Sequence, residues 1–308
     1  IGWVVGHSYI IYGPLIAGMA TVMYEGTPLR PDAGIWWQIV EKYKVSVMFS
    51  APTAARVLKK QDPAFMHKYD LSSLKHIFMA GEPLDQPTHE WFMTELQKPV
   101  IDNYWQTETG WPMLAALPGV ENTPIKYGSP SFPVYGYNLQ IFREDGSVCG
   151  ANEKGIAAVI PPLPPGCLST VWKQDERFVN TYFNGFKGKQ VYSSFDWGMK
   201  DKDGYYFILG RTDDVINVAG HRLGTREIEE AVNVHASIAE CAVVGVADQL
   251  KGQVPMAFAV VKDPSQLATS AQRDSLAREV IATVSKELGA IANPSQVHFV
   301  TQLPKTRS

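Results

Sequence analysis

"VIDNYWQTETGW", residues 100–111, decides the fold, because a short apolar strand runs there into acidic, hydroxyl and aromatic side chains that a buried strand would not carry. Similar units precede it. Residues 45–50, "VSVMFS", and 74–79, "LKHIFM", predict buried strands, and helices are expected to open at Pro52 and Gln86. Strands that alternate with helices indicate a parallel sheet covered by helices. Because ligands bind beyond the carboxyl ends of such strands, the segments "SAPT", "AGEPLD" and "NYWQTETG" mark the expected site.

Two further parts are expected after this parallel α/β subdomain, which we assign to residues 1–123. Glycine and proline multiply from about residue 124, and short apolar runs about a "KDKDG" turn predict a small antiparallel β subdomain over 124–212. Residues 213–308 alternate helix and strand patterns and predict a compact α+β domain. The fold class is therefore α/β plus α+β, and the polar "RTDD" segment between the last two parts is the candidate hinge.

The composition argues against several classes of function. The chain has 308 residues, of which 45% are hydrophobic, and a net charge of -3, so we expect neither nucleic acid nor an anionic membrane as a partner. Its three cysteines lie far apart without a CxxC pair, which argues against a disulfide framework or zinc site and suits the cytoplasm. The apolar run at 3–24 is long enough to cross a bilayer, but it contains His7, Pro14 and three glycines. It predicts a buried strand and helix instead.

Four motifs in this order and spacing resemble the adenylate-forming acyl-CoA synthetases, and within them the acetyl- and propionyl-CoA synthetases: "AGEPLD", "DNYWQTETGWP", "FDWGMKDKDGYYFILGRTDDVINVAGHRLGTREIEE" and "LPKTRS". The resemblance implies an ANL-type large domain, present in part, and a small mobile C-terminal domain. It also implies a reaction in two steps. A carboxylate attacks the α-phosphate of ATP to give an acyl-adenylate and pyrophosphate, and CoA then displaces AMP. The first step brings anions together and therefore uses Mg²⁺ and cationic donors.

The branch of the family follows from two features. "WQTETGWP" and the alanine before "GEP", Ala80, are most similar to the propionyl-CoA branch. The resemblance therefore implies propionate, ATP and CoA as small-molecule substrates, with Mg²⁺ as cofactor.

The resemblance also implies a nucleotide site. Gly81 would let the adenine lie on the backbone, Asp196 would accept from the ribose hydroxyls, and Glu108 would hold Mg²⁺. Arg211 and Arg222 would grip phosphate. Taken alone, the glycine and Asp196 also fit turns, and each arginine also fits a surface ion pair. The implied nucleotide-binding residues are Gly81, Glu82, Pro83, Asp102, Asn103, Tyr104, Trp105, Gln106, Thr107, Asp196, Arg211 and Arg222.

The acyl pocket implied by the resemblance ends at Trp105, whose wide ring leaves room for only a short chain. Val4, Val5 and Ala80 would form the other walls. Acetate-preferring relatives tend to carry a larger valine at the position of Ala80, so this chain should accept one more methylene. The alternative for Trp105 alone is an ordinary core tryptophan.

The remaining implied roles concern the C-terminal domain. Asp213 would be the hinge, and Ala219 and Gly220 would line the pantetheine tunnel. His235 falls at a position linked to a metal in relatives, although a core histidine at a helix end fits it as well. His221 is expected to be structural.

Two parts of the family pattern are not in the sequence. The phosphate loop, "TSGTTGKPKG" in relatives, would lie before Ile1, and the lysine that contacts the acyl carboxylate would follow Ser308. We therefore expect a fragment that adenylates poorly or not at all by itself. The resemblance further implies that an acetyltransferase and a deacetylase regulate the parent enzyme through that lysine.

Two alternatives stay open. One is an acetyl-CoA or medium-chain acyl-CoA synthetase, which Ala80 together with Trp105 disfavours. The other is a non-catalytic nucleotide-binding module, which would not be expected to keep Glu108, Asp196 and both arginines.

Overall fold

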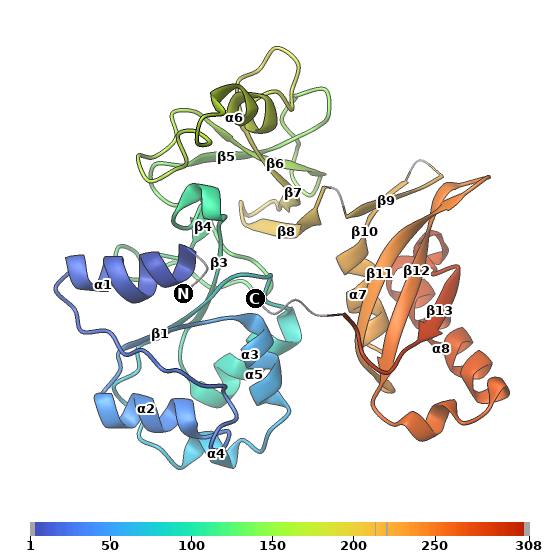
Figure 1. Ribbon diagram of the computed structural model, residues 1–308, viewed down its shortest axis with the longest axis horizontal. Coiled ribbons are helices and arrows are strands. Elements are labelled where there is room, and N and C mark those ends of the chain that lie inside the picture. Colours follow the sequence, from blue (N-terminus) through green and yellow to red (C-terminus); the bar gives the residue numbers. More distant parts are fainter. Residues whose placement is uncertain (1–3, 213, 220, 305–308) are drawn as a thin grey trace. The chain divides into compact units, whose positions relative to one another are not determined.

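The computed structural model describes residues 4–212, 214–219 and 221–304 (Figure 1). For Arg222 it describes only the backbone. The chain forms two compact units. The first comprises residues 1–194 and 198–208, and the second comprises residues 195–197 and 209–308. Within the described ranges, no helix is both long enough and apolar enough to cross a bilayer.

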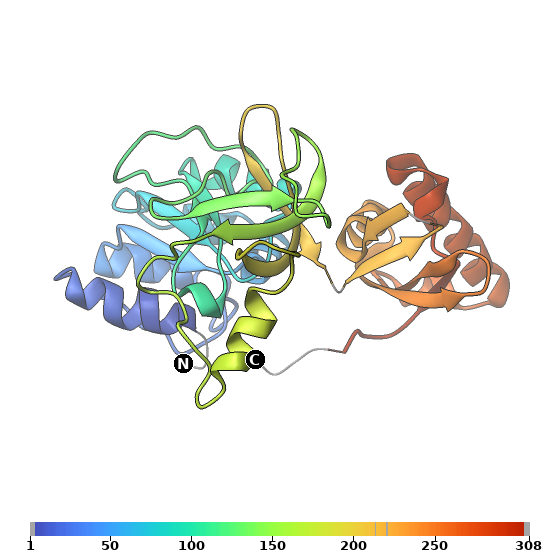
Figure 2. The same ribbon diagram turned by 90° about the horizontal axis from the view of Figure 1, so that it is seen from above.

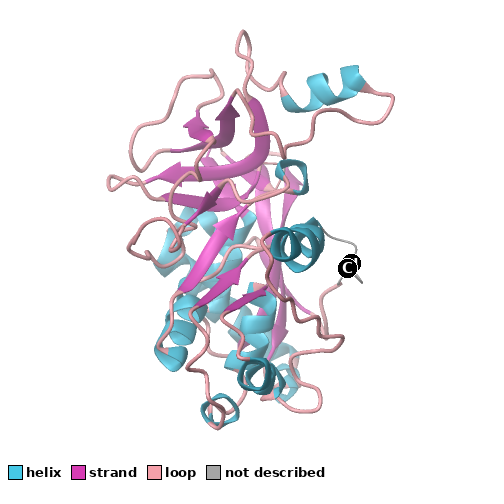
Figure 3. Ribbon diagram, turned by 90° about the vertical axis from the view of Figure 1, so that its left-hand side faces the viewer, coloured by secondary structure: helices cyan, strands magenta, loops and turns pink. Residues whose placement is uncertain are grey.

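A four-stranded sheet in the order β1-β2-β3-β4 organises the first part of the first unit. Its strands are β1 (Val47–Ser50), β2 (His76–Met79), β3 (Val100–Tyr104) and β4 (Leu114–Ala115). The first three are parallel, and β4 runs antiparallel to β3. The helices of this region are α2 (Ile35–Tyr43), α3 (Pro52–Lys59), α4 (Ala64–His67) and α5 (Gln86–Leu96). Figure 3 shows helices flanking these strands, so the predicted parallel α/β layer is confirmed.

Local chemistry explains where the two connecting helices begin. Helix α3 opens at Pro52, whose ring suits the first helical turn and whose missing N–H costs nothing there. Helix α5 opens after Asp85, whose side chain accepts the backbone N–H of Thr88 at 2.9 Å. Ile77 and Met79 alternate along β2 and are fully buried in the core beneath these helices.

The opposite face of the sheet is aromatic. Phe49 and Phe78 are paired in register and their rings stack 6.2 Å apart, and Tyr9 stacks on Phe49 at 4.7 Å. Tyr9 belongs to the π-helix η1 (Gly6–Tyr12), which continues into α1 (Gly13–Ile16). The prediction of a buried strand and helix over 3–24 is wrong: described residues 4–24 form no strand, and Ile16 is 85% exposed. Pro14 cannot donate to a strand ladder, and the chain is irregular after α1.

A second sheet, in the order β5-β6-β7-β8, lies mostly in the first unit, although residues 195–197 of β7 and 209–211 of β8 are assigned to the second. Its strands are β5 (Asn138–Phe142), β6 (Lys154–Ile160), β7 (Tyr192–Lys200) and β8 (Tyr206–Arg211), and α6 (Asp175–Tyr182) precedes β7. Figure 2 shows β5 and β6 side by side, and they run antiparallel. At the β7–β8 turn, the Asp201 carboxylate accepts the backbone N–H groups of Asp203 and Tyr205, each at 2.9 Å. The "KDKDG" turn therefore lies where the sequence predicts it.

The second unit is an α+β domain with its own core. Its sheet has the order β10-β9-β12-β11, with β13 paired to β12. The strands are β9 (Val215–Val218), β10 (His221–Gly224), β11 (Ile238–Asp248), β12 (Gly252–Val261) and β13 (Gln296–Phe299). The helices are α7 (Thr225–Asn233), α8 (Ser270–Leu288) and the 3-10 turns η3 (Pro264–Leu267) and η4 (Ala290–Ala292). Val232 of α7 and Val280 of α8 are fully buried in one cluster with Ala257 of β12.

Candidate active site

One carboxylate ties together the two loops that follow β1 and β2. Glu82 accepts the backbone N–H of Thr53 at 2.7 Å, and also its hydroxyl, so it caps the first turn of α3. The Arg56 guanidinium bridges Glu82 and Asp85, the cap of α5, with 3.1 Å to Asp85. Burial raises the pKa of Asp85, but the hydrogen bonds from Thr88 and Arg56 outweigh burial and hold that pKa below its usual value. The loop at 80–85 is thus anchored from both helices.

The backbone at Gly81 leaves one side open. Gly81 has a φ of 100°, a conformation that favours glycine, and a Cβ built on it would meet no atom within 4 Å. Ala80 beside it is buried, and its N–H donates to Ser50 O at 3.1 Å. A planar ring can therefore approach the backbone of this loop without displacing a side chain.

The polar residues at the end of β3 are buried. Asn103 donates its amide to Met79 O at 3.0 Å, which joins β3 to β2 beyond the ladder itself. Asp102 faces the backbone N–H of Leu84 at 3.5 Å. Among the described residues, Asn103 Oδ1 is buried without a hydrogen-bond partner. Both side chains brace the sheet edge from which the 80–85 loop departs.

A 3-10 turn, η2 (Thr107–Thr109), follows β3. Its backbone is fixed at both ends, because Gln106 N donates to Thr109 Oγ1 at 3.0 Å and Leu168 N donates to Glu108 O at 2.6 Å. Gly110 ends the turn with a φ of 71°, and a Cβ there would lie 2.7 Å from Gly166 O. The "PPLPPG" turn at 161–166 therefore packs directly against the "TETG" turn. Thr107 is exposed.

The side chain of Glu108 is held as well as its backbone. Tyr182 donates its hydroxyl to Glu108 Oε1 at 2.8 Å. Tyr192 donates to Gln106 Oε1 at 3.0 Å, and Gln106 Nε2 donates to Ser194 O at 2.5 Å. Sequence reasoning missed both tyrosines, because they lie 74 and 86 positions from their partners and no local pattern marks them.

Trp105, the expected end wall of the acyl pocket, is half-buried and in contact with Tyr9. The two rings meet edge to face with 5.6 Å between their centres. Burial raises the pKa of Tyr9 to about 12, so its phenol stays neutral. Val4 and Val5 are half-buried and directly precede η1, which carries Tyr9. Trp105 therefore lies beside the segment that contains Val4 and Val5, two of the other expected walls of the acyl pocket. Its contact with Tyr9 was not predicted from the sequence.

Glu108 suits a magnesium ion that is bound mainly by a nucleotide, and not one enclosed by several protein side chains. Within the described ranges no group of three or more His, Cys, Asp or Glu side chains forms a metal cage. Mg²⁺ on a nucleotide usually needs only one or two protein carboxylates besides phosphate oxygens and water. Of the Glu108 oxygens, Oε1 accepts from Tyr182, and no described residue donates to Oε2. His235 accepts the Ser237 N–H at 3.3 Å and lies 3.7 Å from Glu279, and its metal role stays a prediction.

The other expected residues group with the second unit. Asp196 is buried on β7. Arg211 ends β8, with its guanidinium 5.9 Å from the centre of the Phe195 ring. Ala219 has a φ of 49° and donates its N–H to Lys251 O at 2.8 Å. Asp213, Gly220 and the side chain of Arg222 lie outside the described residues.

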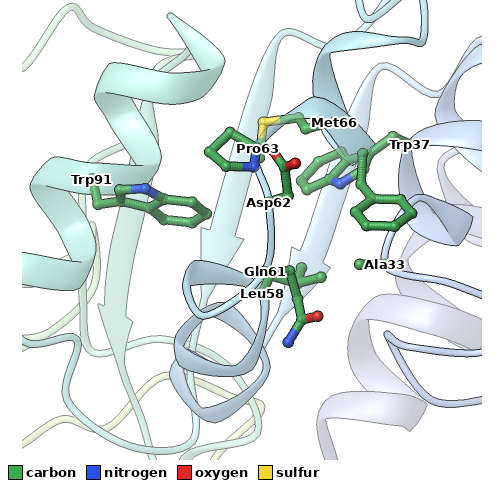
Figure 4. Close-up of a pocket in the computed structure, with 9 residues that line it drawn as sticks. Ala33, Trp37, Leu58, Gln61, Asp62, Pro63, Met66 and Trp91 are labelled. Atoms are coloured by element: carbon green, nitrogen blue, oxygen red, sulfur yellow. The ribbon is translucent and has the colours of Figure 1, made fainter.

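A small hollow of about 10 Å³ lies elsewhere in the first unit, with room for about one water molecule. Figure 4 shows Trp37 and Trp91 on opposite sides of it. None of the expected site residues lines this hollow. It belongs to the packing of α2, α4 and α5 and not to the strand ends.

The fold is that of the AMP-binding enzymes, and the chain belongs to that family. The sequence model described as AMP-binding enzyme matches residues 1–159, and the one described as AMP-binding enzyme C-terminal domain matches residues 227–308. The crystal structure of the anthranilate CoA ligase AuaEII in complex with anthranoyl-AMP is similar, with a TM-score of 0.78 and 26% identity. The match covers 99% of this chain and 55% of the AuaEII chain. The predicted family and fold class are confirmed.

Individual relatives are more specific. The propionate–CoA ligases of Escherichia coli (strain K12) and Salmonella typhimurium (strain LT2) are 58% and 56% identical over the whole of this chain. The acetyl-coenzyme A synthetase of Wolinella succinogenes is 42% identical. The chain spans about half the length of these curated relatives, 49% of the first two and 47% of the third.

Proposed function

We propose that the protein is an AMP-forming acyl-CoA ligase that activates propionate, and that this chain carries its acyl pocket and part of its nucleotide site. Propionate displaces pyrophosphate from ATP to give propionyl-AMP, and the CoA thiol then displaces AMP to give propionyl-CoA. This proposal rests on one observation: two features follow directly after strand β3. Trp105 is in contact with the ring of Tyr9, and the Glu108 carboxylate is held by a hydrogen bond from Tyr182. An apolar end wall beside a fixed carboxylate suits a short acid next to a magnesium nucleotide.

The geometry of the loops supports the proposed nucleotide roles. Adenine lies against the open side of Gly81, along the backbone of Glu82 and Pro83, while the Glu82 side chain is engaged with α3 and is not a ligand. The end of β3 from Asp102 onward borders the nucleotide. We assign the ribose hydroxyls to Asp196, and the phosphates to Thr107, Arg211 and Arg222.

Glu108 would hold magnesium on the nucleotide through its carboxylate, which is the kind of hard oxygen ligand that this ion prefers. When bound, the ion neutralises charge on the phosphates and favours attack at the α-phosphorus. The protein's part is to keep the carboxylate in one orientation, which the hydrogen bond to Oε1 supports.

The acyl specificity depends on Ala80 and Trp105. Ala80 is buried at the end of β2, where a larger side chain would reduce the space for an alkyl chain. The difference of one methylene is worth roughly 1–3 kcal/mol in such a pocket. Propionate is therefore preferred to acetate without excluding it.

The parts of the chain have separate tasks in this proposal. Residues 1–123 and 124–212 form the α/β and β parts of the large domain. Residues 213–308 form the domain that swings about Asp213 and brings Ala219 and Gly220 to the pantetheine arm. The three cysteines are free, which suits a reaction in the cytoplasm.

The test is substrate-dependent exchange of labelled pyrophosphate into ATP, together with formation of propionyl-CoA, by the purified parent protein that contains these 308 residues. Propionate should give the highest specificity constant, acetate a lower one, and longer acids little product. Glu108→Gln should lose magnesium-dependent exchange. The proposal fails if no short carboxylate supports either reaction in the protein that contains these 308 residues, or if acetate is preferred to propionate.

A further inference from the structure

Two tyrosines outside the motifs hold Glu108 and the nearby Gln106 at once. The Tyr182 hydroxyl lies 2.8 Å from Glu108 Oε1, and the Tyr192 hydroxyl lies 3.0 Å from Gln106 Oε1. The two phenol rings stack on each other, with centres 5.3 Å apart and planes 9° from parallel. One side chain ends α6 and the other begins β7, so a separate part of the chain supports the turn.

The stack is itself anchored. Tyr192 is 2% exposed, and Phe183 meets its ring edge to face at 6.0 Å. Phe178, one helical turn before Tyr182, lies 5.5 Å from the Tyr182 ring. Because aromatic rings packed on several sides keep their orientation, the Tyr182 hydroxyl has little freedom to leave Glu108.

The hydrogen bond leaves the carboxylate able to bind a cation. An ionised carboxylate offers about four lone-pair sites, and Tyr182 uses one of them on Oε1. The turn fixes the Glu108 backbone through Leu168, but the side chain still has rotatable bonds that the backbone cannot restrain. A donor on one oxygen fixes the direction in which the other oxygen points.

We propose that Tyr182 is a positioning residue for magnesium-nucleotide binding: its hydroxyl orients the Glu108 carboxylate toward the cation, and the stack on Tyr192 keeps that hydroxyl in place. This inference rests on the proposed role of Glu108. Partners of this kind, one step removed from a metal, typically change metal affinity by about 10- to 100-fold when they are removed.

The direct test is Tyr182→Phe, which deletes the hydroxyl and keeps the ring. Calorimetric titration of the purified protein with ATP is carried out at a series of Mg²⁺ concentrations and again with EDTA. The Mg²⁺ concentration needed for half-maximal nucleotide binding should rise by roughly tenfold. Binding of ATP with EDTA should stay within about twofold of wild type, because no proposed nucleotide contact is lost.

A matched control is Tyr205→Phe. Tyr205 donates its hydroxyl to Pro124 O at 2.8 Å in the same unit and has no proposed role in the site. It should leave the magnesium dependence unchanged. If Tyr182→Phe behaves like Tyr205→Phe, the positioning role is wrong.

A double-mutant cycle separates this inference from the function on which it rests. If Tyr182 acts through Glu108, the variant with both Tyr182→Phe and Glu108→Gln should bind magnesium-ATP no worse than Glu108→Gln alone. Effects that add in the double variant would instead mean that Tyr182 acts structurally. Wild-type magnesium dependence in Glu108→Gln itself would overturn the role of Glu108, and with it this inference.

Discussion

The carboxylate of Glu82 accepts the backbone N–H of Thr53 across two loops that follow neighbouring strands, with 2.7 Å between nitrogen and oxygen. The loop proposed to carry adenine is therefore attached to the first turn of α3. Arg56 extends the attachment to Asp85.

Replacing Arg56 by methionine should loosen this loop with little effect on the stability of the whole protein. The side chains of Arg56 and Glu82 are 36% and 34% exposed, and such pairs contribute only about 0–1 kcal/mol to the free energy of unfolding. The KM for ATP should rise by up to about tenfold, since small misplacements of binding groups are costly. Lys44→Met, which removes the exposed pair with Asp70, is the control and should leave that KM unchanged. An unaltered KM in Arg56→Met would contradict the role of the attachment.

Ala80→Val should move acyl preference from propionate toward acetate, because the added methyl groups enter the pocket at the end of β2. The ratio of specificity constants for propionate over acetate should fall by roughly 10- to 200-fold. Trp105→Gly should act in the other direction and admit longer acids. Steady-state kinetics with acetate, propionate and hexanoate measure both shifts. An unchanged ratio in Ala80→Val would show that the wall is assigned to the wrong residue.

Gly110→Ala should destabilise the turn that carries Glu108. The new Cβ would lie 2.7 Å from Gly166 O, and a φ of 71° costs an alanine about 1–2 kcal/mol even where space is free. We expect the free energy of unfolding to fall by about 1–3 kcal/mol in urea titrations. Gly119→Ala is the matched control: its Cβ meets nothing within 4 Å, so it should change stability by less than about 0.5 kcal/mol. Equal effects of the two substitutions would rule out the proposed strain.

His89 should make stability depend on pH. It is fully buried, and Nε2 donates to Val100 O at 2.7 Å. Burial lowers the pKa of His89 below 6.5, although the bond to Val100 and the charge of Asp85 oppose this. The unfolded chain therefore takes up the proton first as the pH falls below about 6.5. The free energy of unfolding should fall by up to about 1.4 kcal/mol per pH unit down to the folded pKa, and level off below it.

His89→Gln checks this assignment, because glutamine can donate to the same carbonyl but does not titrate. Urea unfolding between pH 8 and pH 5 should show a weaker pH dependence in this variant than in wild type. His298→Gln, at an exposed position on β13, should keep the wild-type dependence. If the pH dependence is unchanged in His89→Gln, groups other than His89 cause it.

The sequence predicts the parts of this fold that depend on local pattern. The strands β1, β2 and β3, the starts of helices α3 and α5 and the "KDKDG" turn all lie close to where their periodicity and turn residues indicate. The hairpin β9–β10 was missed, because Gly224 and the polar residues around it read as a link between domains. The run at 3–24 was misread, because apolar composition alone does not separate a buried strand from a partly exposed helix.

Contacts between distant residues were not predictable in the same way. The resemblance to the family implies the motif residues at the strand ends, but it does not indicate which residues support them. Thr53 and Arg56 for Glu82, Tyr182 for Glu108 and Tyr9 for Trp105 come from other elements, and only the folded chain brings them together. The roles of the site residues and the domain bounds stay predictions.

The most direct test of the central claim is the affinity of the protein for AMP and for its propyl phosphate ester, a stable analogue of propionyl-adenylate, measured by calorimetric titration. If an acyl pocket adjoins the nucleotide site, both should bind with a stoichiometry of one. Burial of three carbons at about 0.8 kcal/mol each should then make the ester bind roughly 50-fold more tightly than AMP. Equal affinities for the two compounds, or no binding of either, would contradict the account.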